Sequence, residues 1–239
     1  METPHVGART LVICPMEIEL AAVRRAARAA RAAGAPHLEL HRSGIGKEAI
    51  VACLRRAVER PAPGLPPVGV VLLAGACGAL RHVEDVPPIA RVIDEHGNEW
   101  RSGVGMVAEG CTLIAVDRIV GTPAEKVALA RGSGADIVDM ESHAFAAACV
   151  ELRVRWGVVR GVSDTPEETL PGEVLSWIRP DGRTRTVRAA WDLLRRPGLI
   201  PHTARVLRRS RRVLPLVGRR VVDVAGGAEA GAAVRPTSR

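Results

Sequence analysis

Two short apolar runs that each end in a carboxylate constrain this chain more than any other feature. Ile137-Val138-Asp139 leads into Met140-Glu141 and an alanine-rich stretch, and the run 154–162 leads into Ser163-Asp164. We interpret both runs as parallel strands of an open α/β sheet, in which ligands bind beyond the carboxyl ends of the strands. The sequence therefore predicts that Glu141 and Asp164 share one site at that edge.

The rest of the chain alternates apolar runs with helical stretches, a pattern typical of one α/β domain. Strands are expected at 9–14, 37–41, 68–73, 83–94, 104–116, 136–139 and 154–162, with a hairpin-like turn at 95–98. Helices are expected at 16–33, 47–58, 123–131, 141–152, 182–196 and 201–217. The run 74–80 consists of small residues and is expected to be a turn where the backbone approaches a ligand.

Composition excludes several classes of protein. No run approaches the roughly 18 apolar residues of a transmembrane helix, and the N-terminus lacks the basic start and apolar core of a secretory signal. The five cysteines are odd in number and scattered, without CxxC or histidine-rich spacing. We therefore expect no metal site, no cofactor and no disulfide frame, and the simplest location is a reducing cytoplasm.

The positive charge is concentrated near the C-terminus. Residues 179–220 hold thirteen Arg against two Asp, a local charge of +11, which leaves the remainder near −3. We expect a catalytic domain at 1–178, a basic helical extension at 179–224 packed on or beside it, and a disordered tail at 225–239. The basic segment is read either as a solvated helical face or as a helix at the inner face of the membrane, favoured by interleaved Leu, Val and Ile and by Trp177 and Trp191. Nucleic-acid binding is disfavoured because aromatic stacking platforms are missing.

Five motifs, in this order, resemble the purine nucleoside phosphorylase and nucleosidase superfamily, in particular the 5′-methylthioadenosine/S-adenosylhomocysteine nucleosidases. They are Met16–Glu19, Ser43–Lys47, Ala74–Leu80, Val138–Ser142 and Val159–Asp164. The stretches 166–171 and 179–183 and the Leu/Arg-rich segment after them resemble the hopanoid-associated phosphorylases. That narrower resemblance implies removal of adenine from adenosylhopane, a lipid-linked nucleoside.

The resemblance implies an α/β fold of three layers, with a central twisted mixed sheet flanked by helices, and a homodimer. It also implies roles for individual residues. Asp164 is the acid that protonates the purine N7, Ser163 orients its carboxylate, and Glu19 activates the attacking water. Glu141 takes the ribose 2′- and 3′-hydroxyls, Met140 packs under the sugar, and the small-residue run contributes Ala76 and Gly78 to the substrate pocket.

The chemistry needs carboxyl groups of two kinds. Protonating the base makes it a neutral leaving group, which requires an acid whose pKa is raised, as desolvation does at an apolar strand end. A carboxylate on the sugar hydroxyls favours the oxocarbenium-like cation that develops on the sugar.

Water is favoured over phosphate as the nucleophile. The resemblance places an Arg and a Ser in the phosphorylases where this chain has Leu73 and Ala76. Ionised Glu19 would also repel a phosphate dianion at about 4 Å by several kcal/mol at an effective dielectric near 20. Lys47 and Arg24 are the residues that could still hold phosphate.

Two departures and several alternatives remain. Residues 120–123, where the nucleosidases carry an aromatic for the base, have none, and 84–85 reads Glu-Asp in place of Gly-Asp. Asp164 as a helix cap and Glu141 as a dipole partner at a helix start are the structural alternatives. For function, the alternatives are a methylthioadenosine/S-adenosylhomocysteine or futalosine nucleosidase, and a non-catalytic nucleoside- or nucleic-acid-binding module.

Overall fold

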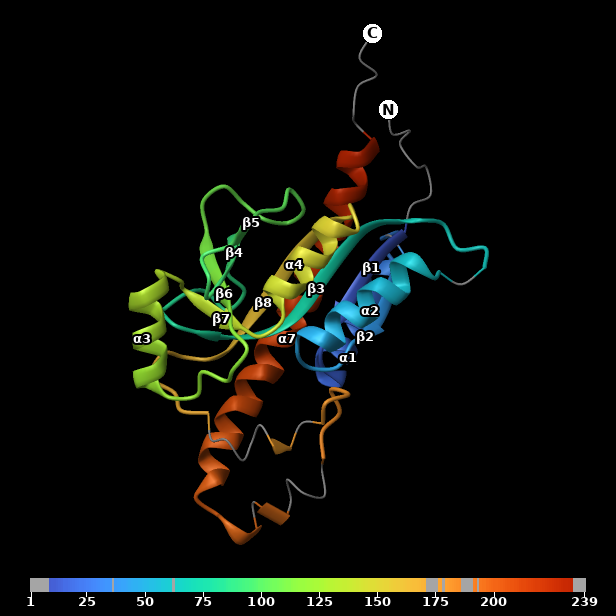
Figure 1. Ribbon diagram of the computed structural model, residues 1–239. Coiled ribbons are helices and arrows are strands. Elements are labelled where there is room, and N and C mark those ends of the chain that lie inside the picture. The colour runs from blue at the N-terminus through green and yellow to red at the C-terminus, as the bar shows by residue number, and fades with distance from the viewer. Residues whose placement is uncertain are drawn as a thin grey trace.

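The computed structural model describes residues 9–35, 37–61, 63–170, 176–177, 179–185, 191–192 and 194–233. An eight-stranded mixed sheet forms the middle layer, and helices cover both of its faces (Figure 1). The predicted three-layer α/β fold is therefore confirmed.

The strand order of the sheet is β2-β1-β3-β7-β6-β4-β5, and β8 also pairs with β3. β1, β2, β3 and β8 are parallel to one another, β7 is antiparallel to β3, and β7, β6 and β4 are again mutually parallel. The strands are β1 (Arg9–Cys14), β2 (Leu38–Arg42), β3 (Val68–Ala79), β4 (Ile89–Asp94), β5 (Glu99–Trp100), β6 (Cys111–Ala115), β7 (Ile137–Asp139) and β8 (Arg155–Asp164).

The helices divide between the two faces. α2 (Lys47–Glu59) and α4 (Ser142–Glu151) lie over one face, where Ile50, Leu54 and Phe145 are fully buried. α1 (Glu17–Arg31) and α7 (Leu199–Ala233) lie over the other face. α3 (Pro123–Ser133) packs at the far end of the sheet and begins with a Thr122–Glu125 capping box and a proline, as the sequence predicts.

Three strand predictions need correction. The small-residue run 74–79 is not a turn: it continues β3 to Ala79, because small side chains allow the strand to run between close neighbours on both sides. The predicted strands 83–94 and 104–116 are shorter, and the turn at 95–98 joins β4 to the two-residue β5. The predicted hairpin therefore joins β4 to β5, and β6 pairs parallel with β4.

The C-terminal region also differs from the prediction. Residues 179–185 form a turn where the helix 182–196 was expected to begin, and residues 186–190 and 193 lie outside the described residues. α7 starts near the expected position but continues to Ala233, nine residues into the expected disordered tail. Val221, Val224 and Ala225 are buried against the sheet, which gives the longer helix an apolar face to pack.

Gly161 decides how closely α7 approaches β8. A Cβ at this position would lie 2.3 Å from Cγ1 of Val213 and 2.5 Å from Cγ2 of Val217. We expect Gly161→Ala to lower the free energy of unfolding by about 1–3 kcal/mol through overpacking. The measurement is urea unfolding followed by circular dichroism.

The matched control is Gly132→Ala in α3, where a Cβ meets nothing within 4 Å. Alanine should stabilise that helical position by about 0.4–1 kcal/mol. A Gly161→Ala protein as stable as the wild type would contradict the close packing of α7 on β8.

Candidate active site

Glu19 joins the start of α1 to the C-terminal part of β3. Its Oε2 accepts a hydrogen bond from the Met16 N–H at 2.8 Å, which satisfies a free donor at the helix N-terminus. Its Oε1 accepts one from the Ala76 N–H at 2.7 Å. The side chain is buried, so of the two early acids of α1 it is Glu19 that faces the sheet. Glu17 is half-exposed and pairs with Arg42.

Arg160, on β8, is the centre of the buried charges. It is 1% exposed, forms an ion pair with Asp139, and its Nη2 lies 3.7 Å from Oε2 of Glu141. A Cβ at Gly75 would lie 2.6 Å from Oε1 of Glu19 and 2.8 Å from Nη1 of Arg160. Gly75 is therefore needed because the Glu19 and Arg160 side chains occupy the space beside its backbone.

Glu141 connects this centre to the loop before α2. Its Oε1 accepts a hydrogen bond from the Gly46 N–H at 3.0 Å, and the side chain is buried at the start of α4. Asp139, two residues earlier, accepts hydrogen bonds from the N–H and the hydroxyl of Ser142. The loop at Gly46 is held in turn by the turn 179–185, where Pro180 O accepts the Ile45 N–H at 3.0 Å.

Asp164 ends β8 and is buried between two partners. Oδ1 accepts a hydrogen bond from the Ser163 hydroxyl at 2.7 Å, and Oδ2 contacts Nζ of Lys126 at 2.5 Å. Lys126 is fully buried in α3, and its ammonium also donates to the backbone oxygens of Thr165, at 2.6 Å, and Glu168, at 3.0 Å. All three ammonium protons therefore have acceptors.

The Met140-Glu141 and Ser163-Asp164 motifs both lie beside β3, but the strands that lead into them are not parallel to each other as predicted. β7 and β8 run in opposite directions, because β7 is antiparallel to β3 and β8 is parallel to it. Gly78 pairs with Val138 on one side and with Asp164 on the other. The carboxyl ends of both strands come together because β3 is long enough to reach both, and Asp164 Oδ2 is 3.2 Å from where a Cβ of Gly78 would lie.

Burial dominates the electrostatics of the site. It raises the pKa of Glu19 to about 7, against the lowering effect of the Ala76 and Met16 hydrogen bonds and of Arg160. Burial and then Asp139 raise the pKa of Glu141, and Arg160 opposes them. Burial raises the pKa of Asp164 against the lowering effect of Lys126. Glu19 can therefore carry a proton near neutral pH, and burial shifts the pKa values of Glu141 and Asp164 in the same direction.

The structure places every predicted site residue on the elements around β3. Ala76 and Gly78 lie within β3, Ser163 directly precedes Asp164, and half-buried Met140 lies between β7 and α4. Among the residues that the structure describes, no three or more His, Cys, Asp and Glu side chains are grouped to hold a metal ion.

Sequence reasoning missed three charged residues of the site. Arg160 lies within the Val159–Asp164 motif. An arginine in an otherwise apolar run could have indicated a buried charge there. Asp139 was read only as the end of a strand, yet it is the ion-pair partner of Arg160. Lys126 gave no signal, since a lysine in the middle of a short helix is ordinarily exposed.

Comparison with known proteins gives a match to one family model over part of the chain. The model of the phosphorylase superfamily matches residues 98–195, which include β7, β8 and the Met140-Glu141 and Ser163-Asp164 pairs. The match covers 98 of the 239 residues of the chain. Among curated protein sequences, none matches this chain.

Solved structures share the fold of this chain at low sequence identity. A Helicobacter pylori 5′-methylthioadenosine/S-adenosylhomocysteine nucleosidase mutant with 5′-methylthioadenosine in its active site is 12% identical, with a TM-score of 0.59 over 95% of this chain and 100% of that one. The Helicobacter pylori futalosine hydrolase is 12% identical, with a TM-score of 0.60 over 95% and 99%. The Campylobacter jejuni methylthioadenosine nucleosidase is 12% identical, with a TM-score of 0.61 over 92% and 100%.

The Lys126–Asp164 pair can be tested through stability. Removing one partner of a buried ion pair leaves an uncompensated charge, so we expect Lys126→Met to lower the free energy of unfolding by about 3–5 kcal/mol. The double variant Lys126→Met/Asp164→Asn removes both charges and should recover part of that loss. Chemical denaturation of the two variants and the wild type measures the difference, and no recovery in the double variant would contradict a direct pairing.

Proposed function

We propose that this protein cleaves the N-glycosidic bond of a purine nucleoside, with water as the nucleophile. The observation that carries the proposal is the meeting of Glu19, Glu141 and Asp164, three buried carboxyl groups from distant parts of the chain, around β3. The match of residues 98–195 to the phosphorylase superfamily model and the fold shared with solved nucleosidases support a nucleoside-cleaving enzyme.

Asp164 supplies the proton to the leaving base. In its protonated form it donates to N7 of the purine while the C1′–N9 bond breaks and its electrons pass to the base. Burial supports this role because it favours the neutral carboxylic acid. Ser163 and Lys126 fix the carboxyl group from two sides, so its orientation is set before the base arrives.

Glu141 and Met140 bind the sugar. In its ionised form, Glu141 accepts hydrogen bonds from the 2′- and 3′-hydroxyls, and its negative charge stabilises the cation that develops at C1′. The hydrogen bond from the Gly46 N–H and the nearby Arg160 hold this carboxylate in place. Met140 supplies an apolar contact beneath the ribose.

Glu19 activates the water. As water attacks C1′, its proton passes to the Glu19 carboxylate, and the reaction yields free purine and a free sugar. Three features disfavour phosphate: Glu19 already occupies the Ala76 N–H, Arg160 is paired with Asp139 and Glu141, and Lys47 and Arg24 are paired with carboxylates at the surface. A phosphate dianion would meet an acid at the position where it needs free donors.

The finer assignment is adenine release from a lipid-linked nucleoside such as adenosylhopane, in hopanoid biosynthesis. It is supported by the resemblance of 166–171 and 179–183, and by the position of the turn 179–185 against the Gly46 loop beside Glu141. The second candidate is a methylthioadenosine/S-adenosylhomocysteine or futalosine nucleosidase, as some solved structures with this fold are named. The homodimer remains an expectation from the family resemblance.

A substrate panel tests the reaction. Adenosylhopane, methylthioadenosine, S-adenosylhomocysteine and futalosine are each incubated with the protein, with and without phosphate, and free base is measured by chromatography. We expect base release that does not depend on phosphate. Asp164→Asn and Glu19→Gln should each reduce the rate by about 10²–10⁴, the usual contribution of one general acid or base.

Glu17→Gln is the matched control for Glu19→Gln, because it removes a half-exposed carboxylate from the same helix turn. It should leave the rate unchanged. Binding of a nucleoside without release of base from any substrate would favour the non-catalytic module. Release only with phosphate would make the protein a phosphorylase and remove the assigned role of Glu19.

The pKa values predict the pH dependence. Glu19, with a pKa of about 7, is ionised above that pH and protonated below it. Since the base must be ionised, kcat/KM should fall about tenfold for each pH unit below 7. Asp164 must be protonated and therefore governs the alkaline limb. Lys126→Met removes the positive charge that lowers the pKa of Asp164, so this limb should move to higher pH. An unchanged alkaline limb in a folded Lys126→Met protein would argue against Asp164 as the acid.

A further inference from the structure

We propose that the surface from Trp191 to Arg212 docks on the anionic surface of a lipid bilayer, with its arginines on lipid phosphates and its exposed apolar side chains in the interfacial layer. We call this surface the docking face. On α7, its members Ile200, Leu207, Arg208 and Arg211 adjoin the recess lined by Arg205, Arg209 and Arg212. Its other members, Trp191 and Leu194, precede α7 in the chain. This docking does not depend on the reaction proposed above.

The charge of the docking face is of one sign. Residues 194–212 contain seven arginines and no Asp or Glu. Arg208 and Arg211 form no ion pair within the part of the chain that the structure describes, so their charge is free for an external anion. Near an anionic membrane each such arginine strengthens binding about fivefold.

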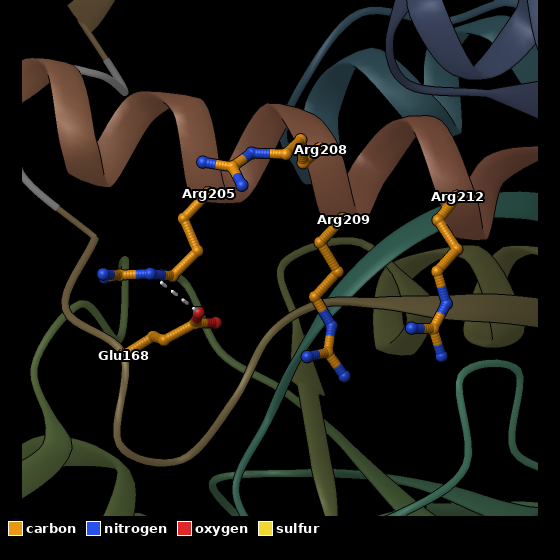
Figure 2. Close-up of a pocket in the computed structure, with 5 residues that line it drawn as sticks. All are labelled: Glu168, Arg205, Arg208, Arg209 and Arg212. Carbon is orange, nitrogen blue, oxygen red and sulfur yellow. Dashed lines mark ion pairs between the residues drawn. The ribbon is translucent and has the colours of Figure 1, made fainter.

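The arginines of α7 also form a recess. An open pocket of about 420 Å³ is lined by Arg205, Arg208, Arg209, Arg212 and one acid, Glu168. Arg205, Arg209 and Arg212 project from the same side of α7 toward the loops beside it, and Arg205 faces Glu168 (Figure 2). Asp85 pairs with Arg209 and Arg212 without cancelling the positive charge of the recess. A phosphate headgroup, which accepts several hydrogen bonds from guanidinium groups, fits this lining.

Exposed apolar side chains accompany the charge. Leu194 is 75% exposed, Trp191 is 53% exposed, and Ile200 and Leu207 are also exposed. Ile200, Leu207 and Arg211 are spaced seven and four residues apart and so share one face of the helix, with Arg208 next to Leu207. Large apolar residues beside arginines, with a tryptophan near them, are typical of helices that lie in the membrane interface.

Nucleic acid fits this surface less well. Duplex binding requires positive charge but gains nothing from exposed Leu and Ile side chains, and Trp191 is the single exposed aromatic ring of the docking face, covered by Arg195 at 4.6 Å. The combination of free arginines and exposed aliphatic groups favours a bilayer.

Docking here would bring the catalytic edge of the sheet to the membrane. The Arg209 Nε donates to the backbone oxygen of Val162, two residues before Asp164, at 3.1 Å. Glu168, at the rim of the recess, is also one of the backbone acceptors of Lys126. A nucleoside carried on a lipid would thus be presented near the proton donor.

In the described residues, no helix is both long and apolar enough to cross a membrane.

Vesicle co-sedimentation tests the proposal with the full chain. We expect binding to phosphatidylcholine vesicles that contain phosphatidylglycerol, weak binding to phosphatidylcholine alone, and loss of binding at high salt. Arg208→Gln/Arg211→Gln should weaken binding to the anionic vesicles by about 25-fold, at about fivefold for each arginine. Leu207→Gln should also weaken binding and reduce its salt-resistant part.

The matched control is Arg60→Gln/Arg131→Gln, which removes the same charge from exposed positions after α2 and in α3. It should bind vesicles as the wild type does. Trp191 fluorescence gives a second readout: it should shift to the blue on anionic vesicles, and Trp191→Phe should remove the shift. Equal losses in both arginine pairs, equal binding to neutral vesicles, or binding to duplex DNA without binding to vesicles would each overturn the proposal.

Discussion

The buried guanidinium of Arg160 is the constraint around which the site is arranged. A charge at the centre of a sheet is tolerated only where partners replace the lost water. Asp139 pairs with it, Glu141 lies within 3.7 Å, and Glu19 approaches it over a residue that must be glycine, Gly75. Three carboxyl groups from α1, β7 and the start of α4 therefore face one cation. The arrangement lets several acids share a buried space without their mutual repulsion unfolding it.

The site contains a second buried cation. Lys126 pairs with Asp164 and not with the group around Arg160, so the proposed proton donor has its own partner. Its remaining protons bind the backbone of the loop after β8, which fixes the loop together with the acid. The two halves of the site meet across β3, which carries Gly75 toward one and Gly78 toward the other. The strands thus hold Asp164, which is protonated in the proposed reaction, beside Glu19 and Glu141, which are ionised in it.

Local patterns in the sequence were sufficient for the fold class, most helix positions, and the two motifs at Glu141 and Asp164. Strand direction was predicted incorrectly, because β7 pairs antiparallel with residues 78–79, which have the composition of a turn and the conformation of a strand. Small residues indicate that another group lies close to the backbone but do not identify that group. At Gly75 the close groups are the side chains of Glu19 and Arg160. Lys126 was beyond prediction because its burial depends on a loop forty residues away in the chain.

Glu19 has a consequence for how such a site can change during evolution. The same carboxylate closes the first turn of α1, fixes the amide of Ala76 and lies beside Arg160. Under the proposed mechanism, a lineage that exchanged water for phosphate would have to replace an acid that also holds a helix to the sheet. The exchange would require a new cap, a new partner for the strand amide and a new charge balance at once. Under the proposed mechanism, single substitutions along that path would lower stability before phosphate could bind, so the end of one helix would also constrain which co-substrate the protein uses.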